Sequence, residues 1–159
     1  MTRPLLIGGA VAVLVGPSAY FGMGQTWGAP VAVTGVGSAA IGFGLLASDT
    51  VGPTRWAGSA AAVSGLVLVV ILIGTSISGE PAVSLVNTAF VSFMTSLALF
   101  GIVGLVSGTI PAIAATSLAV GAPLLAAGVW NERLGDIGFL ATFSGLMVLG
   151  VALREGIGT

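Results

Sequence analysis

Long apolar runs separated by short polar links make up most of the sequence. A helix that crosses about 30 Å of hydrocarbon needs about 20 mostly apolar residues. Six runs reach or approach that length: Pro4–Gly22, Gly28–Ala47, Trp56–Ser76, Ala82–Val106, Pro111–Trp130 and Ile137–Arg154. Because the links are short, successive helices are expected to lie antiparallel beside each other. The pattern therefore predicts an all-α, polytopic integral membrane protein: a bundle of six transmembrane helices that forms a single membrane domain over residues 1–159.

Three of these runs admit a second interpretation. The segment SGTIP, residues 107–111, separates two runs only by its turn-forming residues. Without that break, residues 82–130 form one run that is too long for a bilayer, and the chain has five spans. The first run follows Arg3 and could be a signal peptide. Since Pro17 interrupts its apolar stretch, we interpret it as a membrane span that is kept.

The composition supports a location within lipid. Hydrophobic residues make up 56% of the chain and charged residues 6%, whereas soluble domains carry about 25% charged residues. The net charge of −1 gives no electrostatic reason to expect binding to nucleic acid. We therefore expect membrane lipid, and not nucleic acid, to surround the protein.

The residue types present exclude many chemistries. The chain has no Cys and no His, which excludes thiol chemistry and imidazole ligands. Its basic residues are all Arg, so no lysine is present to form a Schiff base. No charged residue lies at the centre of a predicted span, whereas proton-coupled carriers normally need one there. No phosphate loop or nucleophile elbow is present. We expect no catalytic, cofactor-binding or metal-binding residues, and we predict that the protein is not an enzyme and needs no cofactor.

The arginine positions predict an orientation. With six spans, Arg3, Arg55 and Arg154 fall on one side of the membrane and Arg133 falls on the other. The positive-inside rule then places both termini in the cytoplasm. A multi-pass protein of the cell membrane is the expected result.

Tryptophans mark three of the predicted span ends. Trp27, Trp56 and Trp130 each lie at a boundary between an apolar run and a link. An indole ring combines an apolar body with one N–H group, so it settles at the level of the lipid headgroups. We predict that these three residues are interfacial anchors.

The two halves of the chain resemble each other. AYFG at 19–22 matches ALFG at 98–101, and LLA at 45–47 recurs at 124–126, both with an offset of 79. Each unit, 1–79 and 80–159, would hold three helices, so the second would enter the membrane from the opposite side as an inverted repeat. WNERLGD, residues 130–136, would then be the second copy of the loop around Arg55. The alternative is chance, because Gly, Ala, Leu, Val and Ser are so frequent in this chain.

The same WNERLGD segment gathers three charges, Glu132, Arg133 and Asp136. We expect a turn exposed to water, in which Asp136 caps the N-terminus of the last helix.

The fourth run carries the most polar side chains. Ser84, Thr88, Ser92 and Ser96 recur every four residues, which places them on one face of a helix. Asn87 and Thr95 flank that face. These six residues form a candidate polar path lined with water; the alternative is that the hydroxyls bond to carbonyls of their own helix. Asn87 is the sharpest single candidate, because its amide has more donors and acceptors than its own helix can satisfy.

Small residues and prolines inside the spans have two interpretations each. Pairs such as Gly58 with Ala62, or Ala40 with Gly44, have the spacing that lets helices approach closely, either within the bundle or between copies of the chain. Pro17 and Pro123 are candidate helix kinks, which either serve packing or expose backbone carbonyls to a cavity.

Two functions follow from these observations. The first is a non-catalytic membrane subunit or scaffold that packs in a homo-oligomer or a larger membrane complex. The second is a passive channel or facilitator for a small neutral solute or ion. A continuous cavity beside Thr88 and Ser92 would favour the channel, and a dry interior with exposed faces of small residues would favour the subunit.

Overall fold

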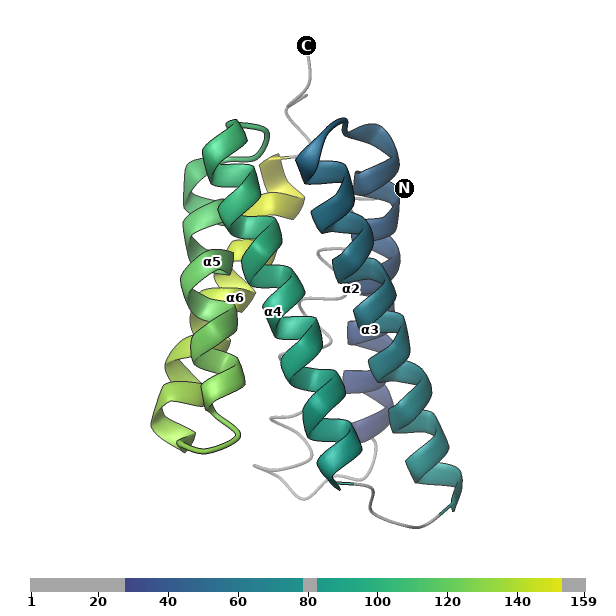
Figure 1. Ribbon diagram of the computed structural model, residues 1–159. Coiled ribbons are helices and arrows are strands. Elements are labelled where there is room, and N and C mark those ends of the chain that lie inside the picture. The colour runs from purple at the N-terminus through teal and green to yellow at the C-terminus, as the bar shows by residue number, and fades with distance from the viewer. Residues whose placement is uncertain (1–27, 79–82, 153–159) are drawn as a thin grey trace.

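The computed structural model describes residues 28–78 and 83–152, which form five α-helices (Figure 1). The helices are α2 (Gly28–Asp49), α3 (Pro53–Ser78), α4 (Val83–Ser107), α5 (Ala112–Ala127) and α6 (Glu132–Ala152). The all-α prediction is confirmed, and each helix matches one of the predicted runs. The first run, Pro4–Gly22, lies outside the described residues with Pro17 and Trp27, so the sixth span stays a prediction.

Three of the helices are long and apolar enough to cross a membrane. They are α3, α4 and α6, with 26, 25 and 21 residues. The apolar part of α2, Val33–Asp49, and the whole of α5 are shorter. At about 1.5 Å per residue, the 16 residues of α5 extend about 24 Å, which is less than the hydrocarbon thickness. These three candidate spans indicate a multi-pass membrane protein.

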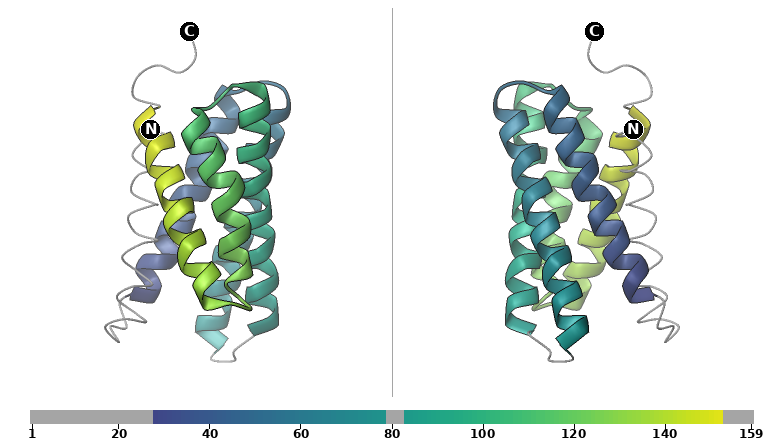
Figure 2. Two further views of the ribbon diagram at one scale, coloured as in Figure 1. Left: turned by 90° about the vertical axis from the view of Figure 1, so that its left-hand side faces the viewer. Right: turned by 90° about the vertical axis from the view of Figure 1, so that its right-hand side faces the viewer.

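Neighbouring helices run antiparallel and pack in the order of the sequence. α2, α4 and α6 run in one direction, and α3 and α5 return in the other (Figure 1). The α5–α6 hairpin and the α2–α3 hairpin lie on opposite sides of the bundle (Figure 2). Within the described residues, each helix makes backbone contacts only with its neighbours in the chain. α2, α4 and α6 are therefore not in direct backbone contact with one another.

The links place the two described arginines at opposite ends of the bundle. Arg55 lies in the first turn of α3, at the end that also holds the α4–α5 link and the last residues of α6 (Figure 1). Arg133 lies in the first turn of α6, at the other end. This separation agrees with the arrangement expected from the sequence, and the compartment that each end faces stays a prediction.

The last helix begins earlier than the sequence predicts, so the expected N-cap at Asp136 is wrong. The carbonyl of Asn131 accepts hydrogen bonds from the backbone N–H groups of Leu134 and Gly135, both at 3.1 Å. Helical bonding therefore starts at Asn131, and Asp136 lies inside α6 as an exposed residue. Glu132 takes the first turn, where a carboxylate is favoured by the positive end of the helix dipole.

Two links depend on glycine. Gly52 before α3 and Gly108 after α4 have φ values of +68° and +67°, which only glycine adopts without steric cost. Gly108 confirms that the predicted break after Val106 is a turn between two helices.

The small-residue pairs noted in the sequence hold the helices of this chain together. A Cβ atom added at Gly58 would lie 3.1 Å from the Cβ of Ala47, and one added at Gly65 would lie 2.8 Å from the Cβ of Ala40. Both neighbours belong to α2, so these glycines seat α2 on α3. In lipid such close approach provides the van der Waals contact that holds helices together. Of the two interpretations, the described contacts support packing within the bundle.

The α5–α6 hairpin approaches even more closely. A Cβ atom at Gly121 would lie 2.6 Å from the backbone nitrogen of Thr142, and one at Gly138 would collide with the backbone of Leu124 and Leu125. Because both contacts are with backbone atoms, no side-chain rotation can relieve them.

We expect Gly138→Ala to destabilise the protein by about 1–3 kcal/mol, because α5 and α6 must move apart to admit the methyl group. Gly74→Ala is the matched control: nothing lies within 4 Å of its added Cβ, and α3 should gain about 0.5–1 kcal/mol of stability from the change. Unfolding by sodium dodecyl sulfate in mixed micelles measures both. Equal effects of the two substitutions would contradict the close crossing.

Candidate functional site

The polar face of α4 points away from the interior of the bundle. Ser84, Thr88, Ser92 and Thr95 are exposed, and Ser96 is half-buried. The hydroxyls of Thr88 and Ser92 donate to the carbonyls of Ser84 and Thr88, each at 2.8 Å. Those of Thr95 and Ser96 likewise donate to the carbonyls four residues earlier, at 2.8 Å and 3.0 Å. Among the two interpretations of this face, the structure therefore shows bonding within the helix.

Asn87 separates from the other members of the predicted path. It is half-buried and lines a cavity of about 430 Å³ inside the bundle. The part of the chain that the structure describes gives its carboxamide no hydrogen bond partner. The predicted set is thus divided: Asn87 faces the interior, whereas Thr88 and Ser92 do not line the cavity.

The cavity lies between the two hairpins, where α2, α4 and α6 make no backbone contact. All five described helices contribute to its wall, which consists of Val36, Ala39, Leu68, Leu72, Val86, Asn87, Phe90, Phe93, Met94, Leu97, Leu125, Phe139, Thr142 and Leu146. Twelve of these fourteen side chains are apolar. Asn87 and Thr142 are the two exceptions, and they come from different helices, α4 and α6.

Thr142 is a polar residue that the sequence analysis did not single out. Its exposed fraction is 4%, and its hydroxyl oxygen has no hydrogen bond partner among the described residues. It differs in this respect from the hydroxyls of α4, which bond to their own helix. The sequence holds no signal for this difference, because Thr142 and Thr88 each have a helix carbonyl four residues earlier to which a hydroxyl can bond.

Large apolar side chains fill the bundle next to one end of the cavity. Phe43 and Phe100 are fully buried, and their rings meet edge to face with centroids 5.0 Å apart and an interplanar angle of 76°. Leu118 and Leu149 are fully buried as well. Edge-to-face contact is a preferred arrangement of aromatic rings, and close-packed interiors leave few voids larger than a water molecule. The cavity wall ends at Leu97 on α4, one turn before Phe100.

Three hydroxyls form a cluster at the end of the bundle that holds the α4–α5 link. Thr54 is fully buried, and its Oγ1 lies 2.9 Å from Oγ1 of Thr109 and 3.2 Å from Oγ of Ser107. Ser107 and Thr109 are 2.8 Å apart. The sequence did not reveal this cluster, because Thr54 is more than fifty positions away from its partners.

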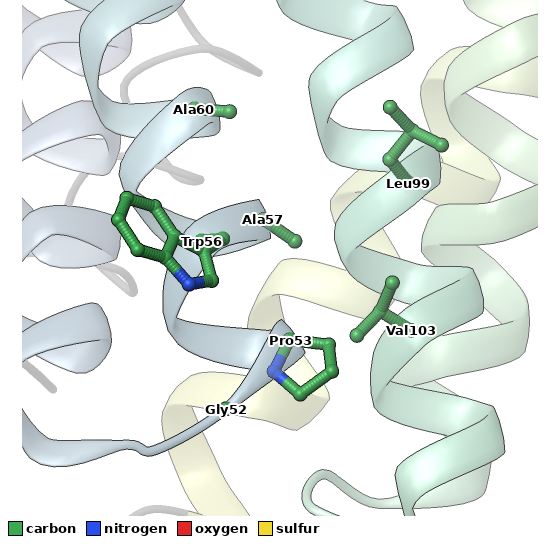
Figure 3. Close-up of a pocket in the computed structure, with 7 residues that line it drawn as sticks. All are labelled: Gly52, Pro53, Trp56, Ala57, Ala60, Leu99 and Val103. Atoms are coloured by element: carbon green, nitrogen blue, oxygen red, sulfur yellow. The ribbon is translucent and has the colours of Figure 1, made fainter.

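An apolar groove lies on the outside of the bundle between α3 and α4. It has a volume of about 480 Å³, and Figure 3 shows Pro53, Trp56 and Ala57 on one wall with Leu99 and Val103 on the other. Trp56 is 77% exposed and lies in the first turn of α3. Its position at a helix end matches the predicted anchor. None of the described residues that line the groove is charged, so its surface suits an apolar chain.

Trp130 and Pro123 are the other predicted anchor and kink residues that the structure describes. Trp130, also 77% exposed, lies in the turn between α5 and α6, so the two described tryptophans mark opposite ends of the bundle. Pro123 lies inside α5, which continues on both sides of it, and its ring is exposed. Their roles as anchors and as a kink stay predictions.

Comparison of the chain with protein-family models, with characterised proteins and with solved structures finds no match.

We expect Thr54→Val to destabilise the protein by about 1 kcal/mol, because a fully buried hydroxyl loses two partners. Thr88→Val is the matched control: the hydroxyl bonds only to its own helix, and the added methyl faces outward, so the change should stay within about 0.5 kcal/mol. Thermal unfolding in detergent measures both. A larger loss at Thr88 than at Thr54 would show that the cluster is not a structural tie.

Proposed function

We propose that the protein is a non-catalytic membrane subunit or scaffold that packs through α4 against a second copy of itself or within a larger membrane complex. The observation that carries the proposal is the row formed by Ser84, Thr88, Ser92 and Ser96, which we call the α4 hydroxyl row. It faces away from the other described helices, and its side chains are small. Small residues every four positions let a second helix approach closely in lipid.

The hydrogen bonds of the α4 hydroxyl row fit this role. Each of the donors at Thr88, Ser92 and Ser96 already has an acceptor on its own helix. These three residues of the row can therefore face lipid in a single chain with their donors satisfied, and they can also pack against another helix without losing those bonds. A self-complementary row of this kind suits a twofold symmetric contact between identical helices.

The passive channel for a small neutral solute or ion has less support. A path for a polar solute needs polar groups along its length, but Thr88, Ser92 and Thr95 do not line the cavity. The cavity is mostly apolar, and beyond Leu97 the bundle is filled by Phe43 and Phe100. Asn87 is the one member of the predicted path that a solute inside the bundle could meet.

The finer features of the membrane arrangement belong to the same proposal. We propose six spans, with both termini in the cytoplasm of the cell, and two inverted units of three helices. The repeat is supported by Arg55 and Arg133, which occupy the first turns of the second helices of two hairpins and lie at opposite ends of the bundle.

We expect the double variant Thr88→Leu, Ser92→Leu to raise the dissociation constant of the oligomer by roughly 3- to 30-fold, because the larger side chains hold the second helix away. The control is Val120→Leu with Val151→Leu, which enlarges exposed residues of α5 and α6. Energy transfer between labelled copies in lipid nanodiscs, together with native mass spectrometry, measures the association.

Two outcomes would overturn the subunit proposal. One is a wild-type protein that stays monomeric and without other polypeptides after gentle extraction. The other is solute flux into liposomes that Asn87→Leu abolishes, which would make the channel the better assignment.

A further inference from the structure

We propose that the internal cavity is a binding site for one neutral, mostly apolar molecule that carries a single hydroxyl or carbonyl group, such as a medium-chain alcohol or ketone dissolved in the membrane. The cavity lies inside the bundle, whereas the α4 hydroxyl row lies outside it. The inference therefore goes beyond the proposed subunit role and does not depend on it.

The size of the cavity sets the size of the ligand. Its volume of about 430 Å³ falls within the range of small-molecule pockets, roughly 300–1,000 Å³. If a heavy atom with its hydrogens takes about the volume of one water molecule, roughly 30 Å³, the cavity holds on the order of fourteen heavy atoms. A twelve-carbon alcohol has this size.

The wall determines the charge and polarity of the ligand. None of the described residues that line the cavity is charged, so an ionised group would lose its hydration without gaining a partner among them. Apolar side chains such as Phe90, Phe139 and Leu146 cover most of the wall, which favours a hydrocarbon body. A neutral apolar molecule therefore fits, and an ion or a sugar does not.

Two polar groups in the wall call for one polar group on the ligand. The hydroxyl of Thr142 is almost completely buried and has no partner among the described residues. Buried polar groups in folded proteins nearly always have a hydrogen bond partner, supplied by the protein, by water or by a ligand. The carboxamide of Asn87 lines the same cavity from α4. A hydroxyl or carbonyl oxygen of the ligand can accept a hydrogen bond from the Asn87 carboxamide. The Thr142 side chain lines the cavity, but its hydroxyl oxygen is buried behind the wall. It can donate to the ligand after a rotation about the Cα–Cβ bond that exchanges the hydroxyl with the methyl group.

The direct test uses 1-dodecanol that carries a photoreactive diazirine near its terminal methyl, added to the protein in lipid nanodiscs. After irradiation, tandem mass spectrometry maps the labelled residues. We expect labels on cavity residues such as Phe90, Phe139 and Leu146, and competition by unlabelled 1-dodecanol. Labels confined to outward residues such as Val67 and Val70 would show that the alcohol only dissolves in the surrounding lipid, and would overturn the proposal.

The role of Thr142 has its own test. Thr142→Val keeps the shape of the side chain and removes the hydroxyl, so labelling of the cavity should fall by roughly 3- to 10-fold. Thr34→Val is the control, because the exposed Thr34 hydroxyl bonds to a carbonyl of its own helix, α2, and the change should leave cavity labelling unchanged. Dodecane with the same diazirine should label the cavity less than the alcohol does; equal labelling by both would overturn the recognition of the polar group.

Stability without ligand distinguishes a binding role from a structural one. In detergent without the alcohol, Thr142→Val should raise the midpoint of thermal unfolding, because it removes a buried hydroxyl that has no partner. Adding 1-dodecanol should stabilise the wild type more than the variant. A lower unfolding midpoint for the variant would mean that the hydroxyl has a partner inside the protein, and the site would lose its polar anchor.

Discussion

The structure depends on one constraint of the membrane interior: a polar group in hydrocarbon must find its hydrogen bond partner within the protein. The backbone meets this constraint by forming helices through almost all of the described chain. The hydroxyls of Thr88 and Ser92 meet it by bonding to carbonyls of their own helix. Thr54 meets it through Ser107 and Thr109. Thr142 is the buried hydroxyl of the described residues that does not meet it, which is why it points to a ligand.

Glycine then decides where the helices touch. Since lipid provides no hydrophobic drive between helices, contact depends on backbones that come close. Gly58 and Gly65 bring α3 onto α2, and Gly121 and Gly138 bring α5 onto α6. Gly101 brings α4 onto α5 as closely, since a Cβ added there would lie 2.6 Å from backbone atoms of Ala115 and Ala119. Among the described helices, α2, α4 and α6 make no backbone contact with one another, and the cavity lies in the space between them.

The inside and the outside of the bundle therefore carry different chemistry. The interior combines an apolar cavity with two polar groups, Asn87 and Thr142. The exterior carries the α4 hydroxyl row and an apolar groove beside Trp56. Binding of a small apolar molecule and association between helices can coexist, because they use opposite faces of α4.

The sequence by itself determined the class of protein and most of its helices. Its apolar runs predicted α2 to α5 with boundaries close to those observed. A helix that crosses hydrocarbon needs an unbroken apolar segment, and the turns between helices require residues such as Gly108. The four-residue spacing from Ser84 to Ser96 correctly placed these residues on one face. The sequence missed the start of α6, where Asn131 and not Asp136 begins the helical bonding.

Only the tertiary structure decided which way each face points. A spacing of four defines a stripe on a helix, but packing against neighbouring helices determines whether that stripe lies inside or outside the bundle. In α4 this packing places the hydroxyl row on the outside and Asn87 on the inside. The same limit applies to Thr54 and Thr142. Their partners, or the absence of one among the described residues, depend on residues far away in the chain, and no local pattern records them.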